Sequence, residues 1–126
     1  MSAIETYNEK VLLVNNLEKN IADMNNNINS VQQNITNMEQ LITTTISEKT
    51  VMDNELLAEQ SNLPNNVETY NAKLIECNNC DSRLNNLNYT KNFMENNLNN
   101  LNETFATLNA NKATADAELS DALAAL

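Results

Sequence analysis

Apolar residues recur at steps of three and four along almost the whole chain. This spacing places them on one face of an α-helix, and over many turns it is typical of a coiled coil and not of a globular helix. We therefore predict an all-α protein of long coiled-coil helices that meet along an apolar seam. The predicted seam residues are Ile4, Tyr7, Val11, Val14, Leu17, Ile21, Met24, Ile28, Val31, Ile35, Met38, Ile42, Val67, Tyr70, Leu74, Cys77, Cys80, Leu84, Leu87, Met94, Leu98, Leu101, Phe105, Leu108 and Leu119.

The two halves of the 126-residue chain resemble each other. The segment IETYNEK at residues 4–10 returns as VETYNAK at residues 67–73. Aligning each residue with the one 63 positions later gives 17 identities without a gap. About seven are expected by chance, and such self-similarity indicates a repeat. We predict a tandem duplication, with repeats at residues 1–63 and 64–126.

Both predicted repeats share an irregularity in the apolar spacing. Val14 to Leu17 is a step of three where four is due, and Cys77 to Cys80 is the same step in the second repeat. A missing residue of this kind is a stammer, which locally overwinds a coiled coil. The shared defect supports the duplication independently of the identities.

The lone proline marks the strongest helix break. A residue before proline is disfavoured in the helical conformation, so Leu63 should end or interrupt the first helix before Pro64. Asn65 is the predicted N-cap of the second helix, with Glu68 three residues on as in a capping box.

A second capping box, Ser2 with Glu5, opens the first helix. We predict helices over about residues 3–61 and 66–125, with a break at 61–65. So short a connection is typical of an αα-hairpin, and a Pro-kinked extended rod is the alternative. The heptad phase slips at the junction, which favours the hairpin. In either form we expect the helices to be covered in a helical bundle or oligomer.

Asparagine makes these helices dependent on packing. The chain has 28 Asn, and each costs about 0.6 kcal/mol relative to Ala within a helix. Isolated helices should therefore be unstable unless another helix covers their apolar face. The absence of Gly also disfavours β-hairpin folds and phosphate-binding loops, which need glycine at fixed positions.

Charge excludes two classes of partner. The net charge is −10, with only seven Lys and Arg, so no basic patch is available for nucleic acid or for an anionic membrane surface. No apolar run approaches the roughly 20 residues that span a bilayer. The N-terminal segment lacks the pattern of a signal peptide. We expect synthesis in the cytoplasm and protein partners, in a homo- or hetero-oligomer.

The CNNC motif invites a metal or redox interpretation. A zinc site needs four ligands, and the chain has no His and no second Cys pair. Cys77 and Cys80 align with the apolar Val14 and Leu17 of the first repeat. We therefore interpret them as small seam residues, with zinc or a disulfide across an oligomer as the alternatives.

Two lysines occupy the same seam position in both repeats. Lys49 and Lys112 are candidates for fixing the register, since a charge within a seam costs stability but can select one alignment. The alternative is that their long side chains reach past the seam to water. No catalytic motif accompanies them, and we predict no enzyme activity, no cofactor and no metal.

These features favour a structural coiled-coil protein, a rod or spacer that assembles with itself or with other subunits of a large complex. An AT-rich coding source would account for the Asn content, as in many viral genomes, so a virion fibre, tail or capsid-associated component is the leading hypothesis. The alternative is an adaptor or chaperone-like hairpin that binds a client helix through its apolar groove.

Overall fold

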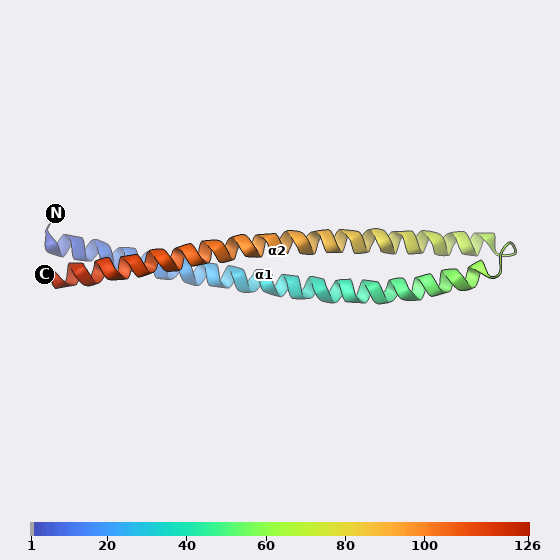
Figure 1. Ribbon diagram of the computed structural model, residues 1–126, viewed down its shortest axis with the longest axis horizontal. Helices are drawn as coiled ribbons and strands as arrows, with labels where there is room; N and C mark the ends of the chain where they lie inside the picture. The colour runs from blue at the N-terminus through green and yellow to red at the C-terminus, as the bar shows by residue number, and fades with distance from the viewer. Residues whose placement is uncertain (1) are drawn as a thin grey trace. The chain divides into compact units, whose positions relative to one another are not determined.

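Two α-helices make up almost all of the protein. The computed structural model describes residues 2–126, in which α1 spans Ala3–Gln60 and α2 spans Val67–Ala124. A turn at residues 61–66 joins them (Figure 1), and no strand occurs among the described residues. The prediction of an all-α protein with two long helices is confirmed.

Helix α1 begins with the predicted capping box. The Glu5 amide donates to Ser2 Oγ over 3.2 Å, and the Ser2 amide donates to the Glu5 carboxylate over 3.4 Å. Two backbone amides near the helix start thereby gain side-chain acceptors.

The predicted break residues Leu63, Pro64 and Asn65 all lie in the turn, and the Leu63–Pro64 peptide bond is cis. The chain reverses there, and α1 and α2 pack against each other as a helical hairpin. The alternative of a Pro-kinked extended rod is not what the structure adopts.

Helix α2 begins one residue later than predicted. The Asn66 carbonyl accepts its first helical hydrogen bond, from the Tyr70 amide at 2.9 Å, so Asn66 and not Asn65 is the N-cap. The Asn66 side-chain amide donates to the carbonyl and the carboxylate of Glu59 at the end of α1. The Asn65 amide donates within the turn, to the Asn62 carbonyl, and the Asn66 side-chain oxygen has no hydrogen-bond partner among the described residues.

The chain divides into two compact units, each built from segments of both helices. Unit 1 combines residues 2–32 with residues 96–126, and unit 2 comprises residues 33–95. Each unit therefore contains one half of the predicted repeat 1–63 and the complementary half of the repeat 64–126.

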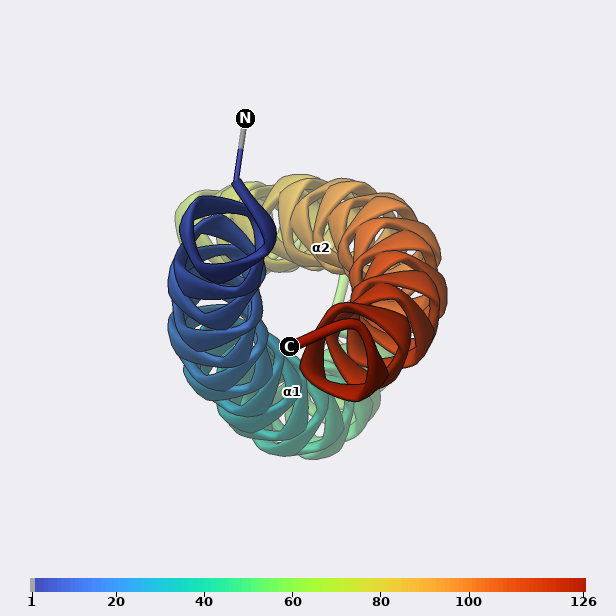
Figure 2. The same ribbon diagram turned by 90° about the vertical axis from the view of Figure 1, so that its left-hand side faces the viewer.

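In unit 1 the two helical segments are antiparallel. Lys10 Nζ lies 2.6 Å from the Glu118 carboxylate, and Glu18 lies 3.8 Å from Lys112 Nζ. As the residue number rises along α1, the number of the facing residue falls along α2. Figure 2 faces the end of this unit, where α1 begins and α2 ends.

In unit 2 the two segments flank the turn and are also antiparallel. Lys73 Nζ on α2 lies 2.8 Å from the Glu55 carboxylate on α1. Farther from the turn, Asp81 lies 3.2 Å from Lys49 Nζ. The residue numbers again run in opposite directions along the two segments.

Few side chains are buried in either unit, as expected where each helix covers only one face of another. The buried residues are Val14, Ile28, Ala115 and Ala122 in unit 1 and Ile35, Thr45, Cys77 and Cys80 in unit 2.

No helix among residues 2–126 has the length and apolar character needed to cross a membrane.

Candidate functional site

The candidate functional site is the helix–helix seam, which we define as the side chains through which α1 and α2 meet within each unit. Among the predicted seam residues, Ile4, Val67 and Leu74 are exposed. Ile4 and Val67 stand in the first turns of the two helices, where fewer neighbours can cover them. Five are buried: Val14, Ile28, Ile35, Cys77 and Cys80. The others are half-buried: Tyr7, Val11, Leu17, Ile21, Met24, Val31, Met38, Ile42, Tyr70, Leu84, Leu87, Met94, Leu98, Leu101, Phe105, Leu108 and Leu119.

Sequence reasoning missed further residues that the helices cover, and five of them are apolar or fully enclosed. Thr45, Ala115 and Ala122 are buried, and Met52 and Leu56 are half-buried. All continue the steps of three and four, so their positions were readable. The polar side chain of Thr45 and the small side chains of the two alanines give a weak apolar signal, whereas Met52 and Leu56 fit the spacing as well as the predicted residues do.

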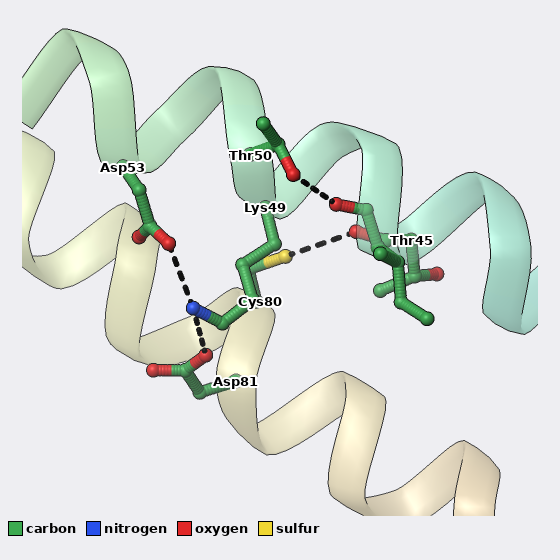
Figure 3. Close-up of polar contacts among 7 residues, drawn as sticks. Thr45, Lys49, Thr50, Asp53, Cys80 and Asp81 are labelled. Atoms are coloured by element: carbon green, nitrogen blue, oxygen red, sulfur yellow. Dashed lines mark hydrogen bonds and ion pairs between the residues drawn. The ribbon is translucent and has the colours of Figure 1, made fainter.

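Lys49 is the centre of an ion-pair cluster in unit 2 (Figure 3). Its Nζ lies 2.8 Å from Asp53 on the same helix and 3.2 Å from Asp81 on α2. Hydrogen bonds to Asp53 and then to Asp81 raise the pKa of Lys49, and the bond from Lys49 lowers the pKa of Asp53. The lysine therefore ties α1 to α2 while its ammonium remains accessible to water.

Beside this cluster lies the Cys77 thiol. Burial raises its pKa, and the neighbouring Asp53 carboxylate raises it further. A thiol in this setting stays protonated near neutral pH, and so it is a poor nucleophile and a poor metal ligand.

Cys80 and Thr45 are the most deeply buried residues of the seam in unit 2. Cys80 is fully buried and Thr45 is 2% exposed. The Thr45 hydroxyl donates to the Leu41 carbonyl over 2.8 Å. Cys80 Sγ donates to the Thr45 carbonyl over 3.7 Å (Figure 3). The polar hydroxyl is satisfied within its own helix, which allows a threonine to occupy a buried position at little cost.

Unit 1 contains an equivalent cluster of one lysine and two carboxylates, in which Glu18 takes the place of Asp81. Lys112 Nζ lies 2.9 Å from Asp116 on α2 and 3.8 Å from Glu18 on α1, and the hydrogen bond to Asp116 raises the pKa of Lys112. We number repeat positions 1–63 from the start of each predicted repeat. Both clusters then join repeat position 49 to positions 53 and 18.

A second ion pair also recurs in both units. Lys10 pairs with Glu118 in unit 1, at 2.6 Å, and Lys73 pairs with Glu55 in unit 2, at 2.8 Å. Both join repeat position 10 to position 55. Hydrogen bonding to Glu55 raises the pKa of Lys73.

Two further cross-helix ion pairs occur in unit 2. Lys91 lies 3.6 Å from Glu39, and Arg83 lies 3.5 Å from Glu48. The same repeat positions in unit 1 carry uncharged residues, namely Ile28, Asn102, Asn20 and Asn111.

Within residues 2–126, no group of three or more His, Cys, Asp or Glu side chains is placed to hold a metal ion. A hollow of about 300 Å³ in unit 1 is lined by Leu13, Leu17, Asn111, Thr114, Ala115 and Glu118, which include no histidine or cysteine.

Comparison with known proteins adds no assignment. No protein-family model matches the chain, and neither the curated proteins nor the solved structures contain a significant match.

Proposed function

We propose that this chain is a structural coiled-coil protein, a helical spacer that assembles with itself or with other subunits of a larger complex. The observation that carries the proposal is the seam itself. It extends through both units, with buried apolar residues and ion pairs between α1 and α2 in each. A chain that consists almost entirely of two long, paired helices is suited to spacing and joining subunits.

The tandem duplication is part of the proposal. Positions 10 with 55 and 18 with 49 of the predicted repeat form the cross-helix ion pairs in both units. Two unrelated halves would need four separate coincidences to produce this agreement. Duplication of one helix-forming segment explains it in one step.

The chemistry of the site supports a binding role and not catalysis. The lysines and carboxylates of the ion pairs are all partly exposed, and the Cys77 thiol is held in its neutral form by burial. We therefore propose no enzyme activity and no cofactor. The net charge of −10 favours protein partners over nucleic acid or an anionic membrane.

The complex that this chain serves is inferred from composition alone. An asparagine content of 28 in 126 residues fits an AT-rich coding source, which favours a virion component among the possible structural roles.

Sedimentation equilibrium and X-ray scattering on the full chain test the structural role. We expect an elongated particle whose average mass rises with protein concentration. A compact sphere of one chain at every concentration would contradict the proposal.

An adaptor that binds a client protein is the second candidate, and an exposed aromatic pair favours it. Tyr89 is 76% exposed and Phe93 is 66% exposed, one turn apart on α2. Exposed aromatic residues are enriched where proteins bind one another. Replacing both by Ser should abolish capture of a client, whereas Leu57→Ser, at a residue 64% exposed on α1, should leave it unchanged. Equal capture by both variants would remove this candidate.

A further inference from the structure

Each helix of the hairpin has a charged residue at all four of the repeat positions (10, 18, 49 and 55) that form the recurring ion pairs. In unit 1 the residues at repeat positions 10 and 18 belong to α1, whereas in unit 2 they belong to α2. The facing positions 55 and 49 are exchanged in the same way. The helix α1 thus contains Lys10, Glu18, Lys49 and Glu55, and α2 contains Lys73, Asp81, Lys112 and Glu118.

A helix with this pattern is complementary to a copy of itself laid antiparallel. When one α1 faces a second α1 in the same register, Lys10 of each copy faces Glu55 of the other. Glu18 of each copy likewise faces Lys49 of the other. The arrangement keeps as many recurring ion pairs as the hairpin has, and both units have the antiparallel direction that it requires.

We propose that the seam is an interaction surface for a second copy of this chain, in which α1 pairs with α1 and α2 pairs with α2 after the turn at residues 61–66 opens. The partner is recognised by the recurring lysine–carboxylate pairs and by the apolar residues between them. This inference rests on the proposed structural role and specifies how copies join.

Pairing of this kind leads to growth in a line. In an antiparallel pair of α1 helices, the two ends that continue into α2 lie at opposite ends of the pair. Each α2 is then free to pair with the α2 of a further copy. Two self-complementary interfaces on one chain that do not close on each other produce a filament and not a closed dimer.

The ion pairs found in unit 2 alone oppose this pairing. Facing α1 helices would place Glu39 of one copy opposite Ile28 of the other, so that the partner Lys91 is lost. Glu48 would similarly exchange Arg83 for Asn20. Lys91 and Arg83 therefore favour the hairpin, and they set the balance between the closed chain and the assembled one.

Carbodiimide coupling with an isotope mixture tests the proposal on the full chain. Equal amounts of unlabelled and ¹⁵N-labelled protein are warmed to unfolding, cooled together over a range of concentrations, and coupled. Carbodiimide joins a lysine amine to an adjacent carboxylate, and mass spectrometry identifies the linked peptides. Lys10 and Glu55 stand near opposite ends of the single helix α1, so a Lys10–Glu55 link must join two copies.

We expect Lys10–Glu55 and Lys73–Glu118 links that combine both isotopes and increase with protein concentration. Replacing Lys91 by Ile and Glu39 by Asn gives unit 2 the residues that unit 1 has at these positions. This variant should raise the yield of both links about threefold, the effect of one lost surface ion pair. The control variant, Lys19→Ile with Glu103→Asn, removes the same charges from exposed positions and should not change the yield.

Absence of the two links from the wild type and the variant at every concentration would overturn the proposal. So would mixed-isotope links confined to Lys10–Glu118 and Lys73–Glu55, because these report exchange of α1 for α1 of another copy without self-pairing. An assembly detected by sedimentation without the α1–α1 link would overturn this inference alone. A monomeric wild type whose variant forms the link would overturn the proposed function alone.

Discussion

Units 1 and 2 use the same charges around different cores. Both join repeat positions 10 with 55 and 18 with 49 by ion pairs. The buried residues of unit 1 are aliphatic, whereas unit 2 buries a threonine and two cysteines in addition to Ile35. The comparison teaches that the same charged residues can face one another in both units while the buried residues between them differ in size and polarity.

The largest difference between the units should appear at repeat position 28. Ile28 is buried in unit 1, and its counterpart in unit 2 is the half-exposed Lys91. Ile28→Ala should lower the free energy of unfolding by about 2–4 kcal/mol, because it leaves a cavity. Denaturant titration measures the loss. The control Leu12→Ala, at a residue 62% exposed, should change stability by less than about 0.5 kcal/mol; equal effects would show that the seam is not the core of unit 1.

The second prediction transfers residues from the first predicted repeat to the second. Cys80 is fully buried, so Cys80→Leu, which introduces the residue at Leu17, should overfill the site and cost about 1–3 kcal/mol. Cys77→Val introduces the residue at Val14, which is itself buried, and should cost less than about 1.5 kcal/mol. The ratio of the two losses is read from urea titrations. If Cys80→Leu proved the milder change, the close packing described around Thr45 would be wrong.

The third prediction uses the two cysteines as reporters of unit 2. Both thiols are buried, so alkylation of the folded chain should be at least about a hundredfold slower than that of the unfolded chain. Burial raises the pKa of Cys77 above its ordinary value of 9.0, so raising the pH towards 9 should accelerate its alkylation less than that of a free thiol. Mass spectrometry of quenched samples measures both rates. Rapid labelling under native conditions would place the thiols outside the seam.

The smallest expected effects concern the recurring lysines. Lys49→Gln and Lys112→Gln should lower the melting temperature slightly and by similar amounts, since both side chains are partly exposed and exposed ion pairs contribute little. High salt should reduce both effects. Calorimetry provides the measurement, and a large loss in only one variant would break the equivalence of the two clusters.

The pH dependence of the cluster around Lys49 follows from its pKa shifts. The pKa of Asp53 is lowered from 3.8, so its contribution to stability is present above pH 3.8 and is lost as the pH falls through the folded-state pKa. The pKa of Lys49 is raised from 10.5, so its contribution is present below that value and is lost as the pH rises through the folded-state pKa. The difference in stability between wild type and Lys49→Gln should therefore be greatest between these limits.

The sequence predicted the helices well because their signals are local. The apolar spacing, Pro64 and the Ser2 capping box depend on neighbouring residues only, and the bounds Ala3–Gln60 and Val67–Ala124 lie within a residue or so of those expected. The hydrogen bond from the Asn66 side chain to Glu59 could not be predicted, because Glu59 becomes a neighbour only after the chain reverses.

The seam was harder to predict than the helices. Spacing identified the face of each helix, but it could not reveal that Thr45 would be buried, since its hydroxyl is satisfied by the Leu41 carbonyl. The cross-helix partners of Lys49 and Lys112 were also beyond reach, because they depend on the antiparallel register between segments far apart in the chain. Spacing along one helix contains no information on that register.

Carbodiimide coupling of the dilute native chain tests the antiparallel register most directly. We predict links within one chain between Lys10 and Glu118 and between Glu18 and Lys112 in unit 1, and between Lys73 and Glu55 in unit 2, where the paired atoms lie 2.6, 3.8 and 2.8 Å apart. Links from Lys10 to Glu68 or Glu76 in place of Glu118 would mean that the two helices run in another register or direction, and would contradict the account.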